Sequence, residues 1–280
     1  MTQIRSLAAG VLVFCAALLG GCAAGSGSSE GMMPGGAPPQ RTQTQEGSQR
    51  SAQAGGIDKP EVARIRTELA FNYFQNGQLA IALEEVRAAI AADPNNASAF
   101  NILGLINMDL GDNPRAEEAF RRSLQIAPND SDLLNNYGWF LCQTKRERES
   151  IDRFLAALKN PLYPSPDKAY LNAGICSQRL GNDGAAEDYY RKAFSLNPGN
   201  PSVLMRMSDL YFRRGLLDEA RFYVDRFNRA FEATAESLWL ALRIERRAGD
   251  RAAESSFAAQ LRRRYPSSQE YLLMQQGKFE

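Results

Sequence analysis

The chain of 280 residues contains no histidine, and this absence excludes a large part of enzyme chemistry. Without imidazole there is no Ser/His/Asp triad, no Cys/His protease and no HExxH zinc site. Net charge is also small, because 33 basic residues face 32 acidic ones, and a charge of +1 gives no long-range field that attracts nucleic acid. We therefore expect a protein that binds through local surfaces, with no catalytic residue, metal, cofactor or small-molecule substrate.

Long apolar segments are scarce as well, and the main apolar run lies near the N-terminus at residues 7–19. This run is too short to span a membrane, and it follows Arg5, which is the layout of a secretory signal peptide. The letters LGGC at 19–22 resemble a bacterial lipobox, in which the cysteine is acylated after cleavage. The sequence predicts a signal peptide over 1–21 and a lipid on Cys22. The alternative is an ordinary signal peptide with an incidental cysteine.

The segment after the cysteine predicts a location and a tether. Ala23 is not Asp, which in many enterobacterial lipoproteins is the signal for retention at the inner membrane. By this resemblance we expect lipid anchoring in the outer membrane of a Gram-negative bacterium, facing the periplasm. Residues 22–58 are rich in Gly, Ser, Ala, Gln, Pro and Thr and contain no aromatic residue. Such a composition cannot form a packed core, so we expect a lipidated, disordered tether.

From Ala63 onward the sequence repeats every 34 residues, with one two-residue insertion at 165–166. Position 15 is Gly in five of six repeats, position 8 is small in five, and position 32 is Pro in four. A small residue lets two antiparallel helices approach where they cross, Gly provides a left-handed turn, and Pro ends the second helix. The six segments are 63–96, 97–130, 131–164, 167–200, 201–234 and 235–268.

These columns resemble the tetratricopeptide repeat. The resemblance implies an all-α fold, namely a right-handed superhelix of six tetratricopeptide repeats over residues 59–268. Residues 269–280 would form a C-terminal cap or tail, with an apolar trio at 271–273. The third repeat departs from the pattern at Lys145 and Leu162, so we expect an irregular junction after its second helix.

In this fold the first helix of each repeat lines the concave face, mainly through positions 2, 5, 9, 12 and 13. Apolar side chains recur at these positions and predict a groove for an amphipathic helix or an extended peptide, with Trp139 as the central anchor. The alternative is that several are core residues, since a frame error of one residue turns a side chain by about 100°. The predicted groove residues are Phe71, Phe74, Leu105, Met108, Trp139, Leu171 and Ile175.

Two cysteines fall within the repeats, Cys142 at position 12 of the third and Cys176 at position 10 of the fourth. On adjacent first helices these positions differ by about 200° in direction and about 3 Å in height. The two side chains should therefore face each other, in a compartment that favours disulfides. We predict a disulfide between them; the alternative is two buried thiols.

Arginines gather in the last repeat at 246–247 and 262–264, beside Glu245 and Glu254. The simplest interpretation is a solvated helical face. The alternative is contact with lipid headgroups, the cell wall or a secretin.

Taken together, the chain resembles the type IV pilus biogenesis lipoproteins of the PilF/PilW family. The resemblance rests on the order of lipobox, tether and six repeats, on the cysteine pair, and on the ending SSQEYLLMQQGKFE. It implies a non-enzymatic, pilotin-type scaffold that promotes localisation or multimerisation of the pilus secretin, and so supports pilus biogenesis and twitching motility. The alternative is a tetratricopeptide lipoprotein adaptor for another periplasmic complex, in outer-membrane protein assembly or cell-wall enzyme recruitment.

Overall fold

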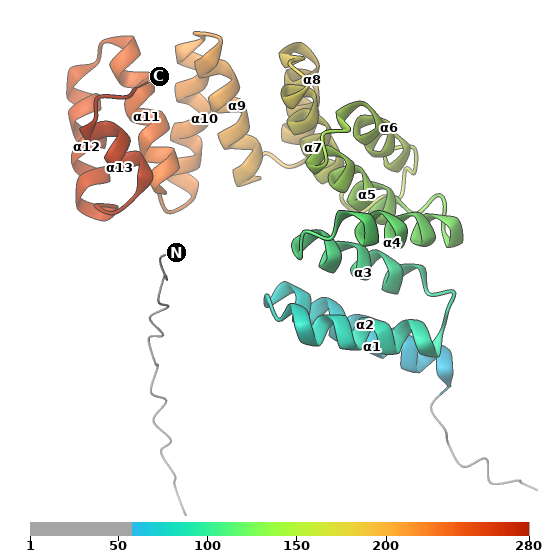
Figure 1. Ribbon diagram of the computed structural model, residues 1–280. Coiled ribbons are helices and arrows are strands. Elements are labelled where there is room, and N and C mark those ends of the chain that lie inside the picture. The colour runs from blue at the N-terminus through green and yellow to red at the C-terminus, as the bar shows by residue number, and fades with distance from the viewer. Residues whose placement is uncertain (1–57, 280) are drawn as a thin grey trace, which may run out of the picture. The chain divides into compact units, whose positions relative to one another are not determined.

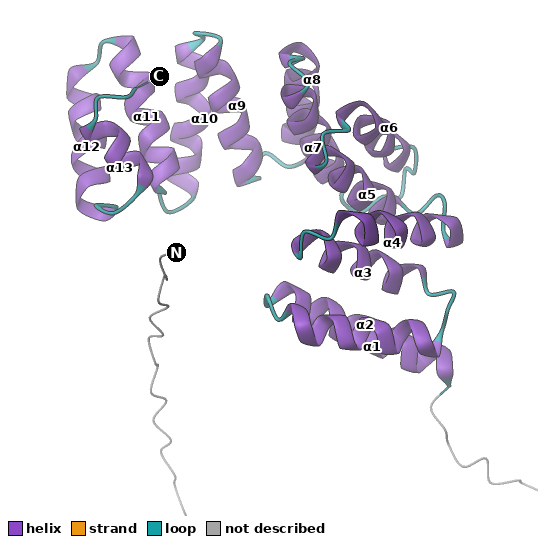
Figure 2. Cartoon of the chain, viewed as in Figure 1, coloured by secondary structure: helices purple, strands orange, loops and turns teal. Residues whose placement is uncertain are grey.

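The computed structural model describes residues 58–279, which form thirteen α-helices and no strand in that range (Figures 1 and 2). The predicted all-α tetratricopeptide superhelix is confirmed. The predicted signal peptide, the lipid site at Cys22 and nearly all of the predicted tether lie outside the described residues.

The helices come in pairs, one pair for each 34-residue repeat. The first helices are α1 (Lys59–Gln75), α3 (Ala97–Asp109), α5 (Ser131–Gln143), α7 (Pro166–Arg179), α9 (Pro201–Arg213) and α11 (Ala235–Ala248). The second helices are α2 (Leu79–Ala92), α4 (Asn113–Ile126), α6 (Glu147–Ala157), α8 (Asp183–Leu196), α10 (Leu217–Ala230) and α12 (Arg251–Arg264).

The turn inside each pair has the left-handed backbone conformation predicted at position 15. Gly111, for example, has a φ of 76°, and the other four glycines of the column are alike. Lys145 replaces glycine in the third repeat, yet its φ is 64°, so the turn is kept despite the less suitable residue. The residue type predicts this turn, but the paired helices impose it even where the residue type disagrees.

Within a repeat, the first helix crosses the second where the residue at repeat position 8 meets the residue at repeat position 24. A Cβ added to Gly104 would lie 2.7 Å from the ring of Phe120, and one added to Gly138 would lie 2.7 Å from the ring of Phe154. A Cβ added to Gly174 would lie closer still to the ring of Tyr190, which is fully buried. Glycine is therefore required in the second, third and fourth repeats, because an aromatic ring fills the space that a side chain would need.

The repeats stack more tightly on one side than on the other. The backbone of each first helix approaches that of the next first helix closely, whereas no two second helices of residues 58–279 approach each other in this way. Successive second helices meet through longer side chains instead, as Phe194 of α8 does with Tyr223 of α10, with ring centres 5.4 Å apart. Buried amides link some of these first helices: Asn136 donates to Asn101 at 3.2 Å, and Asn172 donates to Asn135 at 3.1 Å. We call the side formed by α1, α3, α5, α7, α9 and α11 the first-helix face, and the opposite side the second-helix face.

A short helix, α13 (Gln269–Gln275), follows the sixth repeat and contacts α11 and α12. Its Tyr271 and Leu273 pack against a cluster that includes Trp239, but Leu272 points outward with 43% of its surface exposed. The end of the stack is therefore covered by two of the three predicted apolar residues. Phe279 adds to the cover, with its ring centre 5.4 Å from that of Trp239.

Replacing Gly174 with Ala should lower the free energy of unfolding by about 1–3 kcal/mol, because the new methyl group overlaps the Tyr190 ring. Urea unfolding followed by circular dichroism measures the change. Gly184→Ala is the matched control, since the nearest atom to its added Cβ is 3.8 Å away and α8 gains a better helix former. Equal stability of the two variants would contradict the packing account.

Candidate protein-binding surfaces

The first-helix face begins with an apolar surface on α1. Phe71, at position 9 of the first repeat, has 43% of its surface exposed. Ile65 and Leu69 on the same helix are also exposed, but Leu69 is two residues from Phe71, which is about 200° of rotation, so these two side chains lie on another side of α1. Of the seven predicted groove residues, Phe71 is the one whose side chain stands most clearly in solvent.

The other predicted groove residues are partly or fully engaged in packing. Phe74 is half-buried against the core of the first repeat, and Leu105 and Met108 are half-buried against the cluster around Phe120. Leu171 retains only 9% exposure and belongs to the core of the later repeats, so its assignment to the groove is corrected. Its neighbour Ile175 is half-buried against the same cluster.

Trp139, the predicted anchor, packs beside the cysteine pair. The sulfur atoms of Cys142 and Cys176 are 1.99 Å apart and the Cα atoms 5.9 Å apart, and both residues are buried. Trp139 is half-buried against them, and the guanidinium carbon of Arg179 lies 5.6 Å from its ring centre. Arg179 also donates to the backbone oxygen of Cys142 at 3.2 Å. One side of Trp139 therefore supports the joint between α5 and α7, which makes it less free to receive a partner than Phe71.

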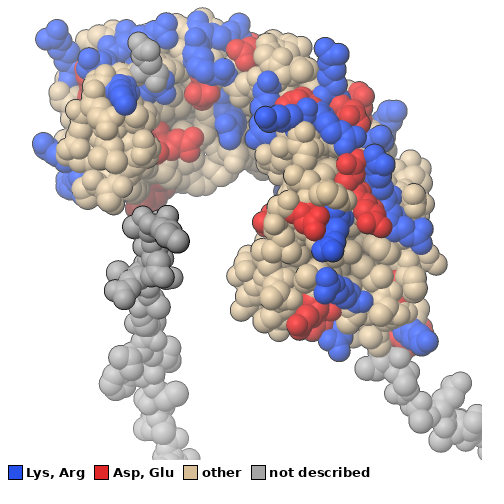
Figure 3. Space-filling view, viewed as in Figure 1, with Lys and Arg blue, Asp and Glu red and all other residues tan. Residues whose placement is uncertain are grey.

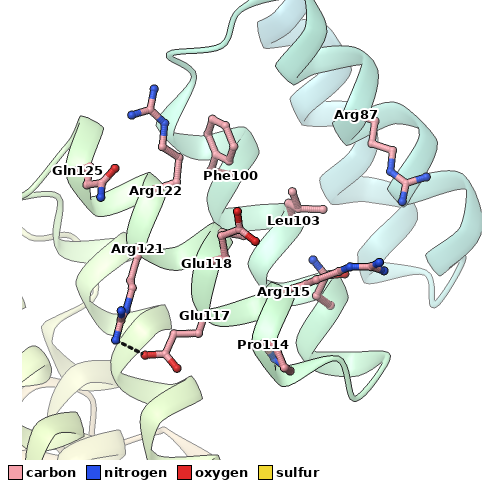
Figure 4. A pocket seen from close by; sticks show the side chains of 12 residues that line it. Arg87, Phe100, Leu103, Pro114, Arg115, Glu117, Glu118, Arg121, Arg122 and Gln125 are labelled. Carbon is pink, nitrogen blue, oxygen red and sulfur yellow. Dashed lines mark ion pairs between the residues drawn. The ribbon is translucent and has the colours of Figure 1, made fainter.

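A large hollow lies on the second-helix face between α2 and α4, with α3 as its floor (Figure 4). It has a volume of about 820 Å³, and Phe100 and Leu103 form its apolar floor. Both residues are only half-buried, because the backbones of α2 and α4 do not approach each other closely and the floor stays open between them.

Some of the charged groups around this hollow form ion pairs centred on Glu117. Arg121 lies 2.7 Å from Glu117, and Arg146 lies 2.8 Å from the same carboxylate. The hydrogen bond from Arg146 holds the pKa of Glu117 below its usual range. Arg122 stacks over Phe100, 5.7 Å from the ring centre. Acidic and basic side chains therefore both line this hollow, and Glu117 is engaged by two arginines.

A second hollow, of about 570 Å³, lies on the first-helix face of the last two repeats. It occupies positions 12 and 13 of the fifth repeat and positions 9, 12 and 13 of the sixth, which are groove positions of the fold. Figure 3 shows basic side chains gathered over this part of the molecule. Arg246 and Arg247 were interpreted from the sequence as a solvated face. The lining residues are Phe212, Arg213, Arg243, Arg246, Arg247 and Phe279.

Within residues 58–279 no group of three or more acidic or cysteine side chains is placed to hold a metal ion. None of the helices described there combines the length and the apolar character needed to cross a membrane.

Comparison with known proteins first defines the class. Residues 67–131 and 167–200 match family models of the tetratricopeptide repeat, in agreement with the paired helices. The chain is thus a tetratricopeptide-repeat protein, a class whose stacked helices present extended surfaces to protein partners.

Whole-chain similarity then identifies the family. The chain is 33% identical over 223 residues to the type IV pilus assembly protein PilF of Pseudomonas aeruginosa, covering 80% of this chain and 88% of that protein. A crystal structure of PilW, a widely conserved type IV pilus biogenesis factor, has a TM-score of 0.73 at 33% identity, over 77% of this chain and 99% of that one. A structure of Pseudomonas aeruginosa PilF has a TM-score of 0.71 at 32% identity, with 79% and 99% covered. The chain belongs to the PilF/PilW family of type IV pilus biogenesis proteins.

We predict that a Cys142–Cys176 bond closes a loop across the joint between the third and fourth repeats. Replacing both cysteines with Ala should lower the free energy of unfolding by about 3–4 kcal/mol, given their separation of 34 residues. Peptide mapping without reductant should recover the two cysteine peptides linked. Alkylation of both thiols in the unreduced protein would contradict the prediction.

Proposed function

We propose that this protein is a non-enzymatic, lipid-anchored scaffold that promotes the localisation or multimerisation of the type IV pilus secretin, and so supports twitching motility. The observation that supports it most is the relationship to PilF and PilW, which spans more than three quarters of the chain at about one third identity. Proteins of this size that share a fold and that level of identity over most of their length commonly share a partner class.

The proposed anchor is a lipid on Cys22, in the outer membrane and facing the periplasm. Several acyl chains together hold a protein on a membrane far more firmly than one chain does. The segment between Cys22 and α1 then gives the repeats reach from the membrane surface. A secretin segment captured by the repeats would be concentrated at the membrane where the secretin assembles.

The proposed contact for the secretin is the first-helix face of the first repeats, centred on Phe71. Its 43% exposed ring provides apolar surface that a partner helix can bury. Phe74, Leu105 and Met108 lie at equivalent groove positions but are half-buried, so they would form the floor rather than the anchor.

Phe71→Glu should weaken secretin binding about tenfold or more, because a charge replaces an exposed aromatic ring at the centre of the contact. In a deletion strain carrying this variant, secretin multimers in the outer-membrane fraction should fall. Immunoblotting of unheated samples measures them.

Phe222→Glu is the matched control, since Phe222 is 50% exposed but lies on α10 on the second-helix face. Both variants should remain folded, because neither side chain belongs to the buried core. Full secretin multimers with Phe71→Glu, or equal losses with both variants, would refute the proposed contact.

Cys22→Ala should prevent lipid attachment, so that the protein no longer fractionates with the outer membrane and secretin multimers decrease. Metabolic labelling with a radioactive fatty acid measures the lipid directly. Incorporation of label into the Cys22→Ala protein would show that the anchor is elsewhere.

A further inference from the structure

The hollow between α9 and α11 is unusual in its chemistry, because four of its six lining residues are arginines and none is acidic. Its arginines come from two successive first helices, Arg213 from α9 and Arg243, Arg246 and Arg247 from α11. The remaining two lining residues, Phe212 and Phe279, are aromatic. It differs from the hollow on the second-helix face, where Glu117 and Glu118 stand among the arginines.

The guanidinium groups are held in place by the two aromatic rings. The guanidinium carbon of Arg243 lies 4.5 Å from the ring centre of Phe212, and that of Arg246 lies 3.9 Å from the ring centre of Phe279. Arg243 Nε also donates to the backbone oxygen of Phe279 at 3.0 Å, and Arg247 Nη1 donates to that of Phe212 at 3.2 Å. Stacked, preorganised guanidinium groups lose little freedom when they bind a planar anion.

Two of the four positive charges have no acidic partner among residues 58–279. Arg246 pairs with Glu254 at 2.7 Å, and Arg213 pairs with Asp209 at 3.1 Å, whereas Arg243 and Arg247 bond only to backbone oxygens. Partial burial lowers the pKa of Arg243, and the charge of Asp209, which pairs with Arg213, opposes this shift only in part.

Glu245, the buried acid of α11, does not neutralise them. Glu245 lies on α11 between Arg243 and Arg246, but both of its carboxylate oxygens accept from Arg221 on α10, at 2.7 and 2.8 Å. The hollow therefore keeps a local excess of positive charge.

We propose that this hollow, which we call the arginine pocket, binds an acidic segment of a protein partner. Its carboxylates would be held by Arg243 and Arg247, because the guanidinium fork matches a carboxylate in a bidentate manner. A protein segment is favoured over a lipid headgroup because the arginines line a recess at the groove positions of the repeats rather than a projecting surface. The site is separate from the proposed secretin contact on α1.

The test uses a fluorescein-labelled peptide, Gly-Glu-Glu-Phe-Glu-Glu-Gly, and the purified protein with residues 22–280, read by fluorescence anisotropy at low salt. Wild-type protein should bind it saturably and should bind the matching peptide with Gln in place of Glu about tenfold more weakly or worse. Added sodium chloride should weaken the binding. No saturable binding of the acidic peptide would overturn the proposal.

Arg243→Gln/Arg247→Gln should weaken binding of the acidic peptide about tenfold or more. Arg262→Gln/Arg263→Gln is the matched control, because it removes the same charge from α12 in the same repeat but outside the pocket. An equal loss in the two double variants would show a diffuse charge effect and overturn the site. Circular dichroism of each variant should match the wild type.

Three further measurements test whether something other than an acidic segment of a partner occupies the pocket. Competition by inorganic phosphate at concentrations similar to the peptide's would identify a simple anion site, and binding to phosphatidylglycerol vesicles through Arg243 and Arg247 would identify a lipid site. Either result would overturn the proposal.

Because Glu280 follows Phe279 directly, the affinity of the Glu280→Gln variant for the acidic peptide is also measured. Unchanged affinity supports a partner ligand, whereas binding more than about tenfold tighter would identify the chain's own acid as the occupant.

Discussion

The close crossing of the two helices in each repeat is the constraint on which the rest of the structure depends. In the second, third and fourth repeats the crossing has no space for a Cβ at position 8, because Phe120, Phe154 or Tyr190 fills it. Dense packing of this kind leaves one relative position for the two helices, so every repeat presents its surfaces in nearly the same way. The left-handed turn follows from the crossing, which explains why Lys145 adopts it without being glycine.

Stacking of these rigid pairs then creates two unlike faces. Contacts between successive first helices, reinforced by the amide pairs at Asn101 and Asn135, hold the first-helix face together. The backbones of the second helices are farther apart, and side-chain contacts such as the ion pair of Glu117 with Arg146 lie on that side. The exposed Phe71 lies on α1 and the unpaired Arg243 lies on α11. The two proposed contacts are therefore at opposite ends of one face. One end offers apolar surface and the other offers charge, so the two would select partners of different chemistry.

Much of the fold followed from residue types at set spacings. Glycine at position 15 predicted the turn, small residues at position 8 predicted the crossing, and the two-residue insertion marked the irregular junction before α7. The facing positions of Cys142 and Cys176 also followed from helix geometry once the repeat frame was known. These features could be predicted because each depends on neighbours within one helix pair, or on the same position in adjacent pairs.

The functional surfaces were less predictable, because burial depends on how closely the neighbouring helices pack. Leu171 and Phe71 both occupy groove positions, yet Leu171 is covered by core residues and Phe71 has no repeat before it. The arginine pocket needs side chains from α9 and α11 together with Phe279, which follows α13, and the 34-residue repeat pattern does not bring these together. The sequence by itself determined the repeat, its turns and its crossing points, since these are local consequences of side-chain size and backbone freedom. Only the tertiary structure decided which side chains remain in solvent and which charges remain unpaired, because both depend on contacts between helices far apart in the chain.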